Sequence, residues 1–196
     1  MKKIIVFFNL FCLTAYTQET EKKWRVFNGF DMYYTSFVNV GNNMTQDAHR
    51  NYGGGFGFKL SAVEYKNIGF SLFYNYTKHS INDIDMIADF EYTKYNESGM
   101  ILSYRLPLTE KTILKPEIGY YGTDAKDRSE GREAVYGGKG FLIGADYMFF
   151  AAHKFAFIGG IHYNYTRLRV EANSAYKDYF ANAHRIQFKI GVHFGR

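Results

Sequence analysis

Apolar and polar side chains alternate along most of the chain with a period of two residues. The clearest segment runs from Ile186 to Phe194, where large apolar residues occupy every second position. Gln187, Lys189, Gly191 and His193 lie between them, and Arg185 precedes them in the same alternation. Because successive side chains of a strand face opposite sides of a sheet, this pattern predicts strands with one apolar and one polar face.

The same alternation predicts eight strands and no regular helix. The expected strands span about 24–38, 52–64, 68–77, 98–106, 114–123, 140–149, 155–167 and 186–194. Short connections near 65–67, 107–111 and 151–154 alternate with longer loops at 41–51, 78–89, 124–137 and 168–183. Short turns on one rim and long loops on the other are typical of an antiparallel up-and-down transmembrane β-barrel. An even number of strands places both termini on the rim with the short turns.

The polar faces of these strands carry charges that a closed barrel would enclose. We predict a lumen-facing polar network formed by Lys59, Arg105, Lys115, Glu117, Asp146, His162, Arg185 and Lys189. The apolar faces run for about five alternate residues, which at a rise of about 3.3 Å and a tilt of about 40° crosses an apolar layer of about 25 Å. A soluble sandwich or barrel, in which the apolar faces would meet in a core, remains the alternative.

Composition agrees with a strand protein. Hydrophobic residues make up 46% of the chain, but the mean hydropathy is only −0.32, which excludes a helical membrane bundle. Aromatic residues reach 19% and gather toward the ends of the expected strands, where a membrane barrel carries its aromatic girdles. No run of Lys or Arg suggests nucleic acid, and we expect no nucleic-acid partner.

The first residues have the three parts of a secretory signal peptide. Met1-Lys2-Lys3 is basic, residues 4–13 are apolar, and Ala15 and Thr17 are small residues before a possible cleavage site. We therefore expect a signal peptide at 1–17 and one barrel domain at 18–196. A retained anchor, or a lipoprotein attached through Cys12, is the alternative. Cleavage would remove Cys12 and two lysines, so the formal net charge would fall from +5 to +3.

Three segments together resemble a known family. The signal at 1–17, the strand-to-turn segment Tyr104–Leu108 and the closing strand Ile186–Phe194 resemble the small eight-stranded outer-membrane barrels of the OmpA and OmpX type, above all the outer-membrane β-barrel domain proteins of Bacteroidota. The resemblance implies an outer-membrane location, contact with outer-membrane lipid or lipopolysaccharide, and insertion by the barrel-assembly machinery.

Little in the sequence indicates catalysis. The six histidines show no spacing typical of a zinc site, and we expect no metal, cofactor or enzymatic activity. The positions of His49, His79 and His184 in or beside long loops predict surface residues, whereas His162 and His193 are expected to share the lumen.

The predicted function is therefore structural or interactive. Eight strands leave an interior just wide enough for side chains to fill, which argues against an open pore. We expect an accessory subunit of an outer-membrane complex, with an outer-membrane protein partner, or a barrel that binds a surface ligand. Tyr176, Tyr179 and Phe180 in the last loop form the candidate contact surface, unless they pack across the barrel mouth. The alternatives are a narrow channel and a lipid A-modifying enzyme using Ser174, His184 and Glu171.

Overall fold

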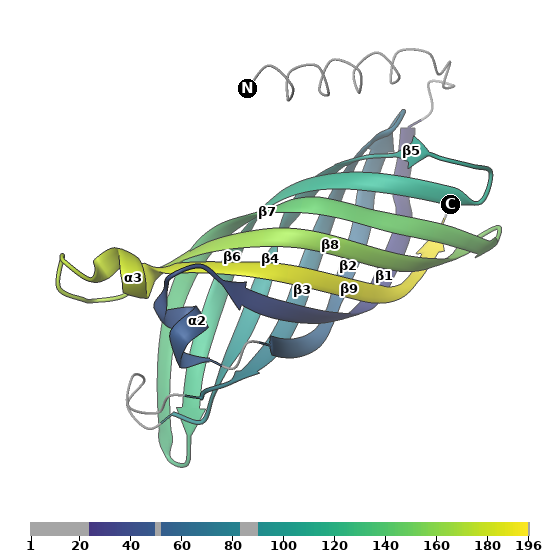
Figure 1. Cartoon of the computed structure of the whole chain (residues 1–196). Helices are drawn as coiled ribbons and strands as arrows, with labels where there is room; N and C mark the ends of the chain where they lie inside the picture. The colour runs from purple at the N-terminus through teal and green to yellow at the C-terminus, as the bar shows by residue number, and fades with distance from the viewer. Residues whose placement is uncertain (1–23, 50–51, 83–89, 196) are drawn as a thin grey trace.

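A computed structural model describes residues 24–49, 52–82 and 90–195 and shows a single closed barrel (Figure 1). The elements in chain order are β1 (Trp24–Val40), α2 (Met44–Ala48), β2 (Tyr52–Tyr65), β3 (Ile68–Ser80), β4 (Tyr92–Tyr104), β5 (Leu106–Pro107), β6 (Thr112–Ser129), β7 (Arg132–Ala152), β8 (Phe155–Leu168), α3 (Lys177–Ala181) and β9 (Asn182–Gly195). The predicted signal peptide at 1–17 and residues 83–89 of the predicted loop 78–89 lie outside the described residues.

The strands close into a ring of eight. Each strand pairs antiparallel with its neighbour in the chain, β4 pairs with β6, and β1 pairs with β9 from Gly29–Gly195 to Val40–His184. The short β5 continues β4 after Arg105 and pairs only with β6 among the described strands. This ring confirms the predicted fold class. Strand edges that would be left unpaired in hydrocarbon are thereby removed.

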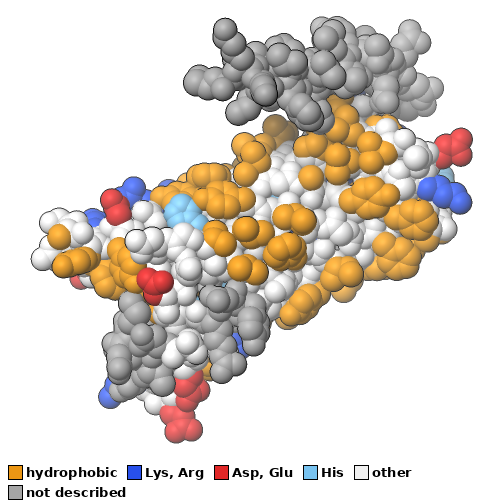
Figure 2. Space-filling view, in the orientation of Figure 1, with side chains coloured by type: hydrophobic (Ala, Val, Ile, Leu, Met, Phe, Trp, Pro, Cys, Tyr) orange, Lys and Arg blue, Asp and Glu red, His pale blue; other side chains and the backbone are white. Residues whose placement is uncertain are grey.

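The wall of the barrel is apolar outside and polar inside. Ile190 is 69% exposed on the outer face, whereas Lys59 is 1% exposed and Arg185 is fully buried in the interior. Hydrophobic side chains spread over the middle of the wall, and charged ones gather toward the two ends (Figure 2). This arrangement is the reverse of a soluble barrel and is the one that acyl chains require. No helix among the described residues is long and apolar enough to cross a membrane.

The two ends of the barrel differ, as predicted. The turns after β2, after β5 and after β7 are short and lie at the end that holds the start of β1 and the end of β9 (Figure 1). We refer to this end as the periplasmic end. The loops that carry α2 and α3, together with the β6–β7 hairpin, lie at the opposite, extracellular end.

Two expectations about the loops were wrong. The segment 124–137 is a continuation of β6 and β7 as a paired hairpin that turns at Gly131, whose φ of 76° suits glycine. Here the outer face is polar as well, with Asp124 and Lys126 on β6, so the alternation of apolar and polar side chains that marks a membrane strand is lost. The loops 41–51 and 168–183 each contain a helix of five residues, where no helix was expected.

Candidate functional site

The candidate site is a buried network of charged side chains at mid-height in the lumen. Lys59 on β2 lies at its centre, with Nζ 2.6 Å from both Glu117 Oε1 on β6 and Asp146 Oδ2 on β7. The same ammonium lies 3.1 Å from Asp31 Oδ2 on β1. One lysine therefore holds carboxylates from three strands, and the network crosses the barrel interior.

A second lysine and two histidines complete this network. Lys189 Nζ lies 3.7 Å from Glu117 Oε2 and 3.5 Å from Asp146 Oδ1. His193 Nδ1 lies 2.5 Å from Asp31 Oδ1, so β9 and β1 are joined in the lumen as well as in the sheet. We call Asp31, Lys59, Glu117, Asp146, His162, Lys189 and His193 the Lys59 cluster.

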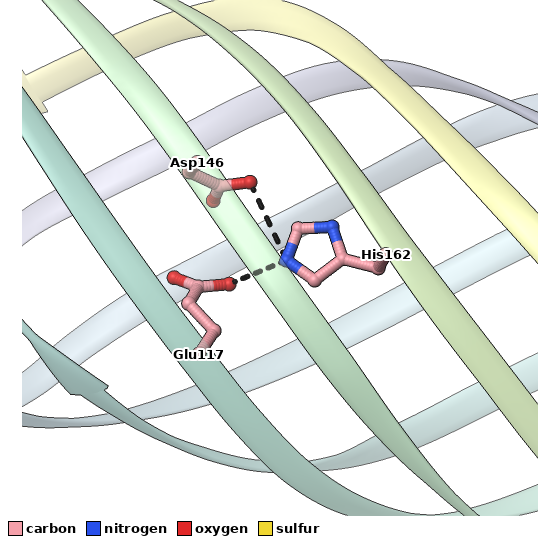
Figure 3. Close-up of side chains that lie close together, drawn as sticks. All are labelled: Glu117, Asp146 and His162. Carbon is pink, nitrogen blue, oxygen red and sulfur yellow. Dashed lines mark hydrogen bonds and ion pairs between the residues drawn. The ribbon is translucent and has the colours of Figure 1, made fainter. Parts of the chain in front are cut away.

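His162 faces the two carboxylates that Lys59 also holds. Its Nε2 lies 3.1 Å from Glu117 Oε2 and 3.6 Å from Asp146 Oδ1, so the ring points between them from β8 (Figure 3). Glycines make room for this contact. A Cβ at Gly144 would press on the His162 ring and the Ile161 backbone, and a Cβ at Gly160 would meet the Asp146 carboxylate.

Glu117, Asp146 and His162 have oxygen and nitrogen atoms within 4.8 Å of one another, a spacing that could hold a metal ion. The charges around them do not fit one. Both carboxylates are already in contact with the ammonium groups of Lys59 and Lys189, so a cation would have to displace two buried lysines. The arrangement is that of a charge-balanced plug.

A second polar level lies toward the extracellular end. Arg185 donates to Glu97 and, at 3.1 Å, to Thr166 Oγ1. Its guanidinium also lies 4.7 Å from the Phe37 ring centre and 4.9 Å from that of Tyr95, which is cation–π geometry. Arg185 was predicted in the lumen network, but it does not belong to the Lys59 cluster and forms its own level.

The remaining predicted lumen residues lie nearer the periplasmic end. Arg105 follows β4 at the rim, where its side chain is 23% exposed and its Nη1 lies 3.5 Å from Glu64 Oε1. Lys115 points inward from β6 and is 7% exposed. Of the eight predicted residues, five therefore form one cluster with Asp31 and His193. Asp31 was recognised as a polar-face residue but not as a member of the network, because it lies in the least regular expected strand.

The predicted surface positions of His49 and His79 were wrong. His49 is 2% exposed and His79 is fully buried, and the two rings lie 6.1 Å apart beside Tyr95. Burial lowers the pKa of His49 to about 4, because the imidazolium would lose its hydration and would also face Arg185. His184, in contrast, is partly exposed on the outer face, where its Nδ1 lies 2.5 Å from the Tyr163 hydroxyl.

His49 begins a chain of hydrogen bonds that ends at Asp127. Its Nδ1 donates to the Thr45 carbonyl at 3.1 Å, and its Nε2 lies 2.6 Å from Thr93 Oγ1. Thr93 Oγ1 donates to Asp127 Oδ1 at 2.5 Å. Burial raises the pKa of this carboxyl. Tyr136 donates to its other oxygen at 2.7 Å.

The extracellular mouth is covered by a small apolar cluster that we call the outer cap. Met44 and Ala48 of α2 pack with Ile81, and Phe90, Tyr179 and Phe180 pack against them. The Tyr179 hydroxyl donates to Asp47 Oδ2 at 2.6 Å and ties the last loop to the first. Of the three residues in the candidate contact surface, Tyr179 and Phe180 thus take the alternative position across the mouth, and Tyr176 is 63% exposed.

The residues considered for an enzyme are not joined. Ser174 Oγ contacts the Asn173 side chain at 3.5 Å, and His184 contacts Tyr163. No hydrogen bond or ion pair between any two of Ser174, His184 and Glu171 occurs in the described part of the chain, which contains all three residues. Among these three residues, the geometry therefore pairs no nucleophile with a base.

Comparison with known proteins adds information about the fold. No protein-family model and no curated protein sequence matches the chain. The structure of Neisserial surface protein A is similar over 89% of this chain and 100% of that one, with a TM-score of 0.59 and 13% identity. The outer membrane protein OprG from Pseudomonas aeruginosa is similar over 85% and 95%, with a TM-score of 0.54 and 9% identity.

A third solved structure agrees. The outer membrane protein AlkL in DMPC lipid bilayers is similar over 90% of this chain and 93% of that one, with a TM-score of 0.50 and 9% identity. At these identities the likeness is one of fold.

Proposed function

The chain has the fold of the small outer-membrane β-barrels, and from this we propose that it is a closed outer-membrane barrel with a structural or interaction role. It would act through its extracellular end, as an accessory subunit that contacts another outer-membrane protein or as a barrel that binds a surface ligand. The lumen would transport no solute.

The observation that carries this proposal is the plugged interior. The Lys59 cluster joins strands β1, β2, β6, β7, β8 and β9 through side chains that are at most 6% exposed. The Arg185 level and the outer cap lie between this plug and the outside. A solute would have to part several ion pairs in a low-dielectric interior, where leaving a charge unpaired is costly.

The extracellular end offers the surface for a partner. Tyr176 in the last loop and Val135 on the β6–β7 hairpin are exposed apolar side chains, at 63% and 57%, outside the apolar band of the wall. Aromatic anchors at a solvent-exposed loop are typical of binding surfaces. Val135 lies on a hairpin that is paired up to its turn, and the loop that carries Tyr176 is joined to α2 by the Tyr179–Asp47 hydrogen bond.

A row of lysines supports the proposed contact with outer-membrane lipid. On the outer face Lys94 lies directly opposite Lys78 on one side and Lys126 on the other. Like charges directly opposite one another destabilise a sheet. Glu133, 4.0 Å from Lys126, is the one carboxylate within ion-pair distance of the three in the described part of the chain. Phosphate groups of lipopolysaccharide at this height would relieve the repulsion. The Tyr92 ring makes cation–π contacts with two of the lysines, since its centre lies 3.8 Å from Lys78 Nζ and 5.4 Å from Lys94 Nζ.

A crosslinking experiment tests the proposed contact. A photoreactive phenylalanine analogue at Tyr176 should give a discrete adduct in intact cells, whereas the same analogue at Leu108 in a periplasmic turn should not give that adduct. Mass spectrometry of the adduct identifies the partner. Absence of any adduct from both Tyr176 and Val135 would contradict a role for this surface.

Two further measurements separate the alternatives. In planar bilayers the protein should show no conductance steps, and regular steps would support the narrow channel instead. Lipopolysaccharide should raise the melting temperature of the detergent-folded protein, and Lys94→Glu should remove that effect while Lys154→Glu in a periplasmic turn retains it.

The last strand, with Phe188 and Phe194 facing outward, is the segment we propose for recognition by the barrel-assembly machinery.

A further inference from the structure

One buried lysine forms no hydrogen bond or ion pair with any of the residues that the structure describes. Lys115 is 7% exposed and points into the lumen, yet no hydrogen bond and no ion pair within 4.0 Å reaches it from residues 24–49, 52–82 or 90–195. The charges that act on it from farther away are the carboxylates of Asp31, Glu117 and Asp146 and the ammonium of Lys59. Those carboxylates are already in contact with other cations, so a buried ammonium remains uncompensated at close range.

Lys115 faces a cavity that opens at the periplasmic end. The wide outer part, which we call the vestibule, has a volume of about 780 Å³ and is lined by Arg25, Arg105, Lys111, Phe150 and His153, among others. A narrow inner part is lined by Lys115, Ser61, Glu64 and His193 and has room for roughly one water-sized particle. The two parts share Asn28, Arg105, Ile113 and Phe150, so the narrow part continues the vestibule inward.

The lining of this cavity carries an excess of positive charge. Its cations are Arg25, Arg105, Lys111 and Lys115, and its carboxylates are Glu64 and Glu110. Glu64 is shared, with Oε1 lying 3.6 Å from Arg25 Nη1 and 3.5 Å from Arg105 Nη1.

Glu64 also accepts from Asn28 Nδ2 at 3.0 Å. The two guanidinium groups carry their N–H donors in the planar arrangement that suits carboxylate and phosphate.

We propose that the vestibule is a binding site for a small oxyanion, a carboxylate or phosphate group that enters from the periplasmic side. The oxyanion lies beside Arg25 and Arg105, with the ammonium of Lys115 facing it from the floor of the narrow part. The cavity is open, so the group can belong to a dissolved anion or to the headgroup of a lipid in the periplasmic leaflet. This site is separate from the extracellular surface of the proposed function, and either can exist without the other.

Titration with inorganic phosphate tests the site. In a neutral detergent, the NMR signal of the Lys115 side chain should shift in a saturable way as phosphate is added. Lys115→Met and Arg105→Gln should each weaken binding by about tenfold or more. Lys154→Met, in a periplasmic turn outside this cavity, is the matched control and should leave the affinity unchanged. Succinate in place of phosphate extends the test to carboxylates.

A second arm distinguishes the sources of the oxyanion. In nanodiscs of phosphatidylcholine and phosphatidylglycerol, a contact between the lipid phosphate and Lys115 that inorganic phosphate fails to displace would identify the headgroup as the ligand. Displacement by inorganic phosphate would identify a dissolved anion. Either result supports the site.

A stability measurement keeps the proposal falsifiable if binding is weak. Without an anion, Lys115→Met removes an uncompensated buried charge and should melt at or above the temperature of the wild type; phosphate should then raise the melting temperature of the wild type alone. The proposal is wrong if phosphate and succinate show no saturable effect up to about 50 mM in detergent and no lipid contact appears in nanodiscs. It is also wrong if Lys115→Met binds phosphate as well as the wild type.

Discussion

Replacing Lys59 by Met is the sharpest test of the plugged lumen. The substitution keeps most of the side-chain volume and removes the ammonium that contacts Glu117, Asp146 and Asp31. Lys189 would then be the one lysine in contact with Glu117 and Asp146, at 3.5 Å or more, among the described residues.

The expected loss of stability follows from the burial of these groups. Lys59 is 1% exposed and all three carboxylates are buried, so solvent screens the interaction little. Removing one partner of a buried ion pair costs about 3–5 kcal/mol, because the other charge stays buried without compensation. Since domains are stable by only about 5–15 kcal/mol, Lys59→Met should lose a large fraction of the free energy of unfolding.

Urea unfolding in liposomes, read from the heat-modifiable mobility of the folded barrel on gels, measures this loss. Lys154→Met in the β7–β8 turn is the control and should change the free energy of unfolding by no more than about 0.5 kcal/mol. In the double variant Lys59→Met/Asp146→Asn, the second substitution removes one of the carboxylates that the loss of Lys59 leaves without its ammonium partner. The double variant should therefore be more stable than the sum of the single losses by about 1–3 kcal/mol.

Two outcomes would refute the reasoning. If Lys59→Met lies within about 1 kcal/mol of the wild type, the cluster is not a tight plug. If the two single losses simply add, Lys59 and Asp146 are not coupled through the contact that the structure shows.

Three further predictions concern the space around the cluster and the outer cap. Gly144→Val should abolish folding or cost about 3 kcal/mol or more in urea titrations, because a side chain there displaces the His162 ring; Gly159→Val, whose Cβ would meet nothing within 4 Å, should be tolerated. Tyr179→Phe should cost the cap about 1 kcal/mol by loss of the Asp47 contact, seen as faster hydrogen exchange in α2 while the barrel wall is unchanged. Between pH 6.5 and about 4, His49 binds fewer protons in the folded cap than in the opened cap. The contribution of His49 to the stability of the cap is therefore fully present above pH 6.5 and is lost as the pH falls through this window. The total loss is roughly 3 kcal/mol. The ratio of α2 protection factors at pH 7.5 and pH 5 should therefore be larger in the wild type than in His49→Gln, and equal ratios would exclude His49 as the source.

The barrel could be predicted because a membrane strand must obey one rule along its whole length. Every second side chain faces lipid, so residues such as Phe188 and Ile190 mark the wall, and the positions between them mark the lumen. This alternation predicted that five members of the Lys59 cluster face the lumen, namely Lys59, Glu117, Asp146, His162 and Lys189. Which of these residues touch could not be predicted, because contact depends on the stagger of strands around the ring.

Outside the membrane that rule no longer applies, and the predictions failed there. The β6–β7 extension is wet on its outer face, so Asp124 and Lys126 resemble loop residues although they lie in paired strands. His79 continues the inward-facing positions of β3 past the expected end of that strand, so the alternation extended by two residues would have placed it in the interior. His49 follows α2, where the packing of residues far apart in the sequence leaves no periodic pattern.

The contact between β1 and β9 determines when the interior can be completed. All other strand pairs join neighbours in sequence, whereas His193 and Asp31 are separated by 162 positions. Closing a short hairpin costs less chain entropy than this most distant pairing, so we expect the β1–β9 contact to form last. Lys189 and His193 arrive with that final strand. Until β9 pairs with β1, Asp31 contacts Lys59 but lacks its second neighbour, His193. Closure of the barrel and completion of the buried ion pairs therefore occur in the same step of its biogenesis.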